Sequence, residues 1–127
     1  MDVRELPRVI QKESIVAVVT EPFLGRPLRG LESRTVIERE ASALTALYHD
    51  AFAVFAKLLH KKTGVVIFIT PVFRHKKEWI DVPEFLPGVE QRGFARSAFA
   101  GGHESLSYAR PDQRVGRRIW KFVRRAD

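Results

Sequence analysis

Residues 14–25 read Ser-Ile-Val-Ala-Val-Val-Thr-Glu-Pro-Phe-Leu-Gly, and this stretch decides how the chain folds. Its first part, Ser14–Thr20, is apolar and β-branched without polar alternation, which is typical of a strand buried on both faces of a parallel sheet. Pro22 and Gly25 end the strand and begin a loop. In open α/β sheets, ligands bind beyond the carboxyl ends of such strands. The same pattern also fits an ordinary strand exit with an acidic residue beside a structural proline.

The residues that follow predict a βαβ unit. Thr35–Glu38 has the spacing of a capping box, and apolar residues then recur every three or four positions up to Lys62. This helical pattern is long enough for a break to be expected near either end. Val65–Thr70 is a second apolar, β-branched run, which we expect to stop at Pro71. A strand, a helix and a parallel strand joined by short connections form a right-handed crossover.

Beyond this unit the pattern changes to short elements. Arg74–Glu78 is predicted to be a charged loop and Val82–Phe94 a short helix. Ser105–Arg110 and Arg117–Arg124 flank a turn and predict an antiparallel hairpin. The predicted fold is therefore α/β, with two parallel strands, a crossover helix and a C-terminal antiparallel hairpin. Residues 1–127 are predicted to form a single domain, because no linker, repeat or low-complexity stretch divides them.

The composition excludes several classes of protein. The chain has 127 residues, of which 45% are hydrophobic and 29% charged, so it can form a core and is not a disordered tail. It has no cysteine, which excludes disulfides, thiolate metal sites and a cysteine nucleophile and fits a cytoplasmic protein. Its apolar runs are much shorter than the ~20 residues of a membrane span, and residues 1–4 do not resemble a signal peptide, so we expect no membrane contact. No metal site is predicted, because ligand spacing is lacking among the four histidines, His49, His60, His75 and His103.

The basic residues are concentrated in the second half of the chain. The net charge is +7, and residues 1–60 contribute none of it because they contain 8 basic and 8 acidic residues. Residues 61–127 contain 14 basic and 7 acidic residues. A basic surface favours polyanions, because each neutralised phosphate releases counterions. A basic protein without a specific partner would have the same composition.

Three stretches of the sequence resemble a known enzyme family. They are Asp2-Val-Arg-Glu-Leu-Pro7, Thr20-Glu-Pro-Phe-Leu-Gly25 and the tail Ser107-Tyr-Ala-Arg-Pro-Asp-Gln-Arg-Val-Gly-Arg-Arg-Ile-Trp120. Together they are similar to the second half of a class I S-adenosylmethionine (AdoMet)-dependent methyltransferase, in particular to the RNA N2-guanine methyltransferases that carry a THUMP domain and act on tRNA. The resemblance extends from residue 2 to about residue 124. It implies a partial Rossmann-like fold, AdoMet as the cofactor and RNA, in particular tRNA, as the partner.

The resemblance implies a role for each residue of the Thr20–Phe23 segment. In this family the fourth strand ends in an Asp/Asn-Pro-Pro-Tyr/Phe motif. Phe23 matches the aromatic residue that stacks on the flipped base, and Pro22 matches the second proline. Thr20 takes the Asp/Asn position, whose oxygen hydrogen-bonds the amino group of the target base, and Glu21 takes the first proline. This departs from the motif: either Glu21 supplies the carboxylate one residue later, or the site is altered or inactive.

Most of the family's cofactor site has no counterpart in the sequence. Asp2 matches the acidic residue that follows the third strand and lies near the adenine of AdoMet. The chain contains no Gly-x-Gly, so the glycine-rich loop after the first strand is lacking. Residues 1–13 show no clear helix or strand, and two parallel strands make a small core. We therefore expect a C-terminal half that lacks the first three strands and binds AdoMet weakly or not at all. It would pair with an upstream half, or with itself through an exposed sheet edge.

Four arginines are candidates for nucleic-acid binding. Arg26 and Arg29 lie just beyond the Thr20–Phe23 segment, where they could hold phosphates that flank a target base. Arg114 and Arg117 lie in the C-terminal hairpin, which is rich in arginine. All four could equally be solvated charges with no ligand.

The hairpin has two interpretations as well. Strand alternation places Arg118, Trp120 and Phe122 on one face, where they could stack on and neutralise nucleic acid. Alternatively, Trp120 and Phe122 pack in the core while the arginines face water. The predicted function is methyl transfer to the exocyclic amino group of a base, with a non-catalytic nucleic-acid-binding module and an inactive fragment as alternatives.

Overall fold

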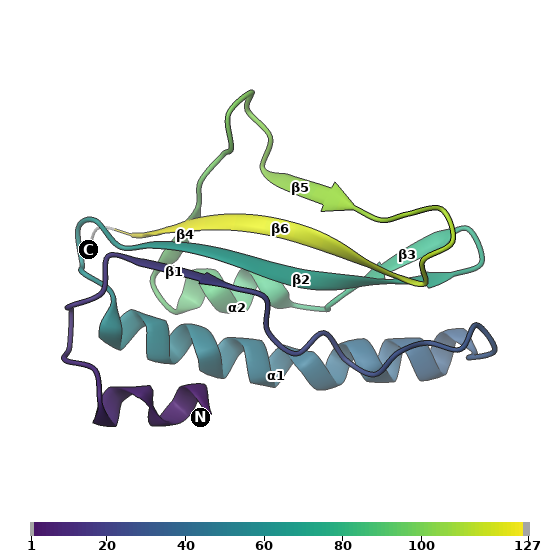
Figure 1. Ribbon diagram of the computed structural model, residues 1–127, viewed down its shortest axis with the longest axis horizontal. Helices are drawn as coiled ribbons and strands as arrows, with labels where there is room; N and C mark the ends of the chain where they lie inside the picture. Colours follow the sequence, from purple (N-terminus) through teal and green to yellow (C-terminus); the bar gives the residue numbers. More distant parts are fainter. Residues whose placement is uncertain (1, 126–127) are drawn as a thin grey trace.

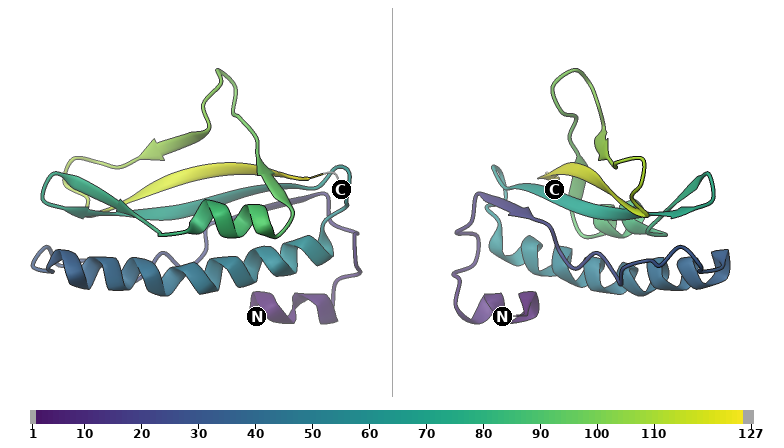
Figure 2. Two further views of the ribbon diagram at one scale, coloured as in Figure 1. Left: turned by 180° about the vertical axis from the view of Figure 1, so that it is seen from behind. Right: turned by 45° about the vertical axis from the view of Figure 1, so that its right-hand side comes forward.

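The computed structural model describes residues 2–125 and shows a mixed sheet with all described helices on one face (Figure 1, Figure 2). In chain order the elements are the 3₁₀ helix η1 (Val3–Arg8), β1 (Ala17–Thr20), α1 (Arg34–Leu58), β2 (Val65–His75), β3 (Glu78–Asp81), α2 (Phe85–Gln91), β4 (Phe94–Arg96), β5 (Ser105–Tyr108) and β6 (Val115–Arg124). The strands pair in the order β1-β2-β6-β4, with β3 also pairing with β2 and β5 with β6. α1 runs along the sheet, and the predicted combination of a parallel pair with antiparallel strands is confirmed.

β1 and β2 form the parallel pair that the sequence predicts, over four residue pairs. The regular strand is shorter than the predicted Ser14–Thr20, and the expectation that it is buried on both faces is wrong. Val16 and Val19 are 62% and 75% exposed. The reason is that β1 pairs with β2 alone within the described residues, and the helices cover only the other face of the sheet (Figure 1). β1 is therefore an open edge strand.

Both ends of α1 differ from the sequence prediction. The expected cap at Thr35 is wrong, because the hydroxyl of Ser33 accepts the hydrogen bond from an amide of the first turn. The helix also ends before Lys62. Leu59 leaves it in an extended conformation and pairs with Ile15, so the chain reaches β2 without a further helical turn.

β2 continues through Pro71, so the prediction that the strand stops there is wrong. Proline lacks an amide N–H and is tolerated in a sheet where no neighbouring strand needs one. Pro71 occupies such a position, because β1 pairs only as far as Phe68 and β3 begins to pair at Val72. The predicted charged loop Arg74–Glu78 is accordingly the β2–β3 hairpin, with a left-handed turn residue at Lys76.

The C-terminal half contains the predicted hairpin, in which β5 and β6 are antiparallel. The predicted helix Val82–Phe94 is shorter than expected. α2 ends at Gln91, and Gly93, with a φ of 91°, leads into β4. Residues 1–13, which were expected to form no clear element, contain η1, whose first turn is capped by Asp2.

The core lies between the sheet and the helices. Phe52 of α1 is fully buried, and its ring centre lies 4.8 to 5.9 Å from those of five other phenylalanines, Phe55, Phe68, Phe85, Phe94 and Phe122. Edge-to-face aromatic pairs of this kind add stability beyond the area they bury. Trp120 and Phe122 are 7% and 0% exposed, which confirms their interpretation as core residues. The helix-covered face is thus closely packed, while the other face and the β1 edge are open.

Candidate functional site at the end of β1

The chain leaves β1 at Thr20 and crosses in front of α1 before the helix begins (Figure 1). A cavity of about 370 Å³ lies where this loop passes α1. Thr20, Pro22 and Phe23 line it on one side and Asp2 of the N-terminal segment on another. The remaining walls come from α1, η1 and β2, through Val3, Leu47, Tyr48, Ala51, Phe55 and Phe68. The structure therefore brings together three of the four predicted motif residues and the predicted cofactor residue.

Phe23 is presented to solvent although its backbone is firmly held. The ring is 62% exposed. The buried hydroxyl of Tyr48 donates a hydrogen bond to the Phe23 carbonyl oxygen at 2.5 Å. Burial raises the pKa of Tyr48, so the hydroxyl keeps its proton and remains a donor at neutral pH. The result is a flat aromatic face at the rim of the cavity, fixed from within by α1.

Glu21 does not line this cavity. Its carboxylate accepts a hydrogen bond from Arg117 Nε at 3.0 Å, and the second guanidinium nitrogen also lies 3.0 Å away. Both nitrogens meet the same carboxylate oxygen, and because Arg117 belongs to β6, this ion pair joins the loop to the C-terminal strand. Of the predicted residues with side-chain oxygen acceptors, Thr20 and Asp2 line the cavity and Glu21 does not.

The carboxylate of Asp2 is already paired. It accepts hydrogen bonds from the Arg4 amide at 2.8 Å and from the Arg4 guanidinium at 3.0 and 2.8 Å. These bonds hold the pKa of Asp2 well below its usual range, so it is ionised at neutral pH. A hydroxyl-bearing ligand in the cavity would meet a carboxylate whose charge is largely neutralised by Arg4.

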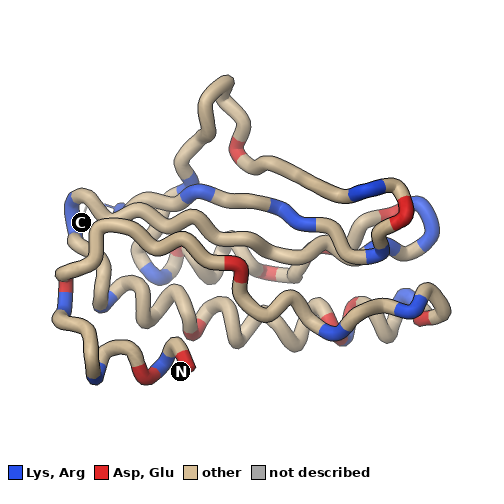
Figure 3. The backbone as a smooth tube through the Cα atoms, in the orientation of Figure 1, with Lys and Arg blue, Asp and Glu red and all other residues tan. Residues whose placement is uncertain are grey.

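Arg26 and Arg29 lie in the loop after β1, Arg114 directly precedes β6 and Arg117 lies in it. Figure 3 shows basic residues on both stretches of the backbone. Arg26 and Arg114 line a second cavity of about 360 Å³. The Arg114 guanidinium packs directly on Gly30, where a Cβ atom would lie 2.4 Å from its central carbon. The backbone at Arg29 is held by Glu32, whose carboxylate accepts from the amides of Arg29, Gly30 and Leu31 and consequently has a lowered pKa.

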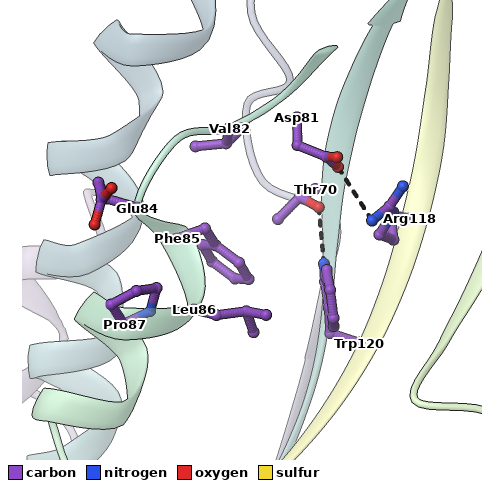
Figure 4. A pocket seen from close by; sticks show the side chains of 9 residues that line it. All are labelled: Thr70, Asp81, Val82, Glu84, Phe85, Leu86, Pro87, Arg118 and Trp120. Carbon is purple, nitrogen blue, oxygen red and sulfur yellow. Dashed lines mark hydrogen bonds and ion pairs between the residues drawn. The ribbon is translucent and has the colours of Figure 1, made fainter. Parts of the chain in front are cut away.

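A further cavity of about 230 Å³ lies beside α2 and contains none of the predicted site residues (Figure 4). Trp120 Nε1 donates to Thr70 Oγ1 at 2.9 Å, and Arg118 pairs with Asp81 at 3.3 Å. Thr70 is 3% exposed, and its hydroxyl accepts the Trp120 hydrogen bond, so the Thr70–Trp120 pair is a structural element of the core. Within residues 2–125, no group of three or more acidic, histidine or cysteine side chains could hold a metal ion.

A parallel strand pair joined by a helix and extended by antiparallel strands gives a mixed α/β fold. No protein-family model and no curated protein matches the sequence. Among solved structures, the chain is similar to a protein from Thermus thermophilus described as a DNA modification methylase. Its complex with S-adenosyl-L-methionine matches with a TM-score of 0.65 and 14% identity, covering 99% of this chain and 52% of that one. The PvuII DNA methyltransferase, described as cytosine-N4-specific, matches with a TM-score of 0.59 and 16% identity over 97% of this chain and 47% of that one.

These likenesses concern the fold, because the sequence identities are low. The chain spans about half the length of the solved structures it matches. The expected methyltransferase-like architecture is thereby supported, and the neighbours are described as enzymes of DNA rather than of RNA. No helix within the described part of the chain is long and apolar enough to cross a membrane.

Proposed function

We propose that this chain is the base-binding half of an AdoMet-dependent methyltransferase that acts on an exocyclic amino group of a nucleobase. One observation carries the proposal. Phe23, directly after the carboxyl end of a parallel strand, presents an exposed ring at the rim of a cavity lined by Thr20 and Asp2. Ligands bind at this edge of open α/β sheets, and an extruded base needs a flat surface to stack on.

The local chemistry suits an amino group. The lone pair of an exocyclic amine is delocalised into the base, so the amine is a poor nucleophile until hydrogen-bond acceptors orient it. The Thr20 hydroxyl and the Pro22 carbonyl would accept hydrogen bonds from the amine, while Phe23 holds the ring in place. Glu21 is paired with Arg117, so we assign it to positioning the loop rather than to contacting the base.

The residues of this chain fit part of an AdoMet site. When bound, AdoMet supplies the methyl group that the amine attacks. A cavity of about 370 Å³ is within the usual range for small-molecule sites, and Asp2 at its wall could accept a hydrogen bond from the cofactor. The sequence has no Gly-x-Gly to approach the amino-acid end of the cofactor. We therefore assign the remaining contacts to polypeptide outside this chain.

The open edge of β1 is where we place that polypeptide. An unpaired strand edge exposes backbone groups that another strand can bind, and Val16 and Val19 extend this edge with exposed apolar surface. The matched structures are about twice as long as this chain, which supports a complementary half that adds a strand beside β1. A second copy of this chain is the alternative occupant. Gel filtration with light scattering distinguishes the two, because only the second copy gives a dimer of the chain alone.

Photo-crosslinking tests the base-binding role. Single strands of RNA and of DNA that contain one 6-thioguanine are irradiated with the protein, and the adduct is mapped by mass spectrometry. We expect the adduct at Phe23 or its immediate neighbours, its loss in Phe23→Ala and its retention in Phe23→Tyr. Leu31→Ala, which removes a still more exposed apolar side chain (91% against 62%) from the same loop, serves as the control. An adduct pattern that Phe23→Ala leaves unchanged would contradict the proposal.

The RNA and DNA arms of this experiment also separate the two acceptors. The resemblance implies guanine N2 of tRNA, whereas the structural neighbours are described as DNA methylases.

Calorimetry with AdoMet tests whether part of the cofactor site lies outside this chain. We expect the isolated chain to bind AdoMet more weakly than low-micromolar, and low-micromolar binding would mean that the cofactor site lies within this chain.

A further inference from the structure

A groove that the sequence analysis did not single out lies between the β2–β3 hairpin, β5 and the start of β6. It encloses about 400 Å³. Six of its lining residues bear either a guanidinium or a large aromatic ring, and we call their surface the arginine–aromatic groove: Arg74, Trp79, Tyr108, Arg110, Arg117 and Arg118. The sequence brings these residues from three separate stretches, so no single motif reveals them.

Two aromatic rings of the groove are exposed. Trp79 is 37% and Tyr108 56% exposed, in contrast to the buried Trp120. The guanidinium carbon of Arg74 lies 4.8 Å from the centre of the Trp79 ring, and Arg74 also donates to the Pro111 carbonyl at 2.5 Å. These contacts fix the orientation of the indole. An oriented, solvent-facing ring in a concave surface is a platform on which another flat ring can stack.

The guanidinium groups of the groove are only partly neutralised. Arg118 pairs with Asp81 at 3.3 Å, and Arg117 pairs with Glu21. No carboxylate forms an ion pair with Arg74 or Arg110 in the described part of the chain. The groove therefore has unused capacity to donate hydrogen bonds to an anion.

An ion pair links the groove to the loop that carries Phe23. Arg117 lines the groove, and its guanidinium is bound to Glu21, two residues before Phe23. The ion pair with Glu21 thus connects the two surfaces.

We propose that the arginine–aromatic groove binds the single-stranded nucleic acid next to the target base. A base stacks on Trp79 or Tyr108, and the phosphates contact Arg110, Arg117 and Arg118. Single strands are favoured over duplexes because only unstacked bases can offer a free face to the rings. The inference rests on the proposed function, since it assigns the path of the same substrate beyond the Phe23 site.

Fluorescence anisotropy tests the groove with labelled ten-nucleotide single strands of RNA and of DNA and with a hairpin duplex of each. The double variant Trp79→Ala/Tyr108→Ala is expected to bind single strands about 10-fold or more weakly, because one base–aromatic stack is lost. Trp79→Phe is expected to keep the affinity. Arg110→Ala should reduce the dependence of affinity on salt by about one counterion, whereas Arg39→Ala on α1, a charge-matched control, should change neither affinity nor selectivity for single strands.

Intrinsic fluorescence gives a second readout on the unmodified chain. The protein has two tryptophans, and stacking on Trp79 should quench its emission while the buried Trp120 is unaffected. Circular dichroism of each variant checks that the fold is retained. Trp79 quenching by a single strand that is absent with the duplex supports the groove.

The outcomes separate this inference from the proposed function. If Phe23→Ala abolishes the 6-thioguanine adduct while the Trp79→Ala/Tyr108→Ala variant binds normally, the groove assignment is wrong and the base site stands. If the groove variant loses affinity and Phe23→Ala has no effect on the adduct, the groove stands and the chain is a binding module without a base site. Tighter binding to duplex than to single strands would overturn the groove assignment.

Discussion

The two faces of the sheet differ in how much of their apolar surface is buried. On the helix-covered side, Phe52 meets five other phenylalanine rings, and Trp120 has a buried hydrogen-bond partner in Thr70. On the β1 side, Val16 and Val19 are mostly exposed, and the strand has one unpaired edge. The first side is packed with buried aromatic rings, whereas the second exposes apolar side chains to solvent.

The residues that stabilise the fold are largely different from the exposed residues of the candidate site. Buried aromatic area stabilises the fold, and it fills the space between the sheet and the helices, where Tyr48, Phe55 and Phe68 also form walls of the Thr20 cavity. The exposed ring of Phe23 lies on the loop that leaves β1, outside this core, and Glu21 of the same loop pairs with Arg117. Substitutions on the two sides should therefore affect different measurements.

The largest difference is expected in stability. Phe52→Ala should lower the free energy of unfolding by about 3 to 5 kcal/mol, because it removes a fully buried ring and leaves a cavity. Val19→Ala, at a position 75% exposed, should change it by about 0.5 kcal/mol or less. Urea denaturation followed by circular dichroism measures both. A loss for Val19→Ala comparable to that of Phe52→Ala would mean that β1 is covered by another copy in solution.

A smaller effect on stability is expected at Tyr48, which joins the core to the Phe23 loop. Tyr48→Phe removes the hydrogen bond to the Phe23 carbonyl and leaves that acceptor without its buried partner, so stability should fall by about 1 kcal/mol. Amide exchange of residues 21–28 should accelerate, since the loop loses its anchor on α1. Tyr108→Phe is the control, because the Tyr108 ring is 56% exposed and the change should be close to neutral. Unchanged exchange in Tyr48→Phe would show that the loop is held by other contacts.

The smallest expected effect is a pH dependence of amide exchange in the loop at residues 29–31. The amides of Arg29 and its neighbours lower the pKa of Glu32 in the folded protein. A lowered folded-state pKa contributes order that is present above the unfolded-state value and lost as pH falls through the folded one. We expect amide exchange at residues 29–31, corrected for intrinsic pH effects, to become faster on acidification in the wild type. In Glu32→Gln it should be fast at all pH values, and a pH-independent difference between the two proteins would refute the role of the charge.

Prediction from sequence succeeded where the pattern is local. The parallel unit, the β5–β6 hairpin and the core positions Trp120 and Phe122 follow from apolar periodicity and from turn residues. It failed at Pro71, since the effect of a proline depends on which neighbouring strand is present at that point. It also failed for the burial of β1, because a run of valines has the same sequence pattern in a central strand and at an open edge.

In the candidate site, too, the sequence predicted local features and missed contacts between distant residues. The sequence alone singled out Thr20, Pro22 and Phe23 as the end of a strand, but not the Tyr48 hydrogen bond that holds Phe23 outward. The ion pair between Glu21 and Arg117 joins residues 96 positions apart, and no spacing rule could predict it. Trp79 and Tyr108 were missed because each is an isolated aromatic residue, and only strand pairing brings them to one groove.

The amino-acid order by itself determined the βαβ unit and the C-terminal hairpin, because periodicity and turn chemistry act over a few neighbouring residues. Only the tertiary structure decided which edge stays open, which face the helices cover and which distant arginines meet the loop. Those outcomes depend on contacts between segments far apart in the chain, and a strand's own sequence does not specify what lies beside it.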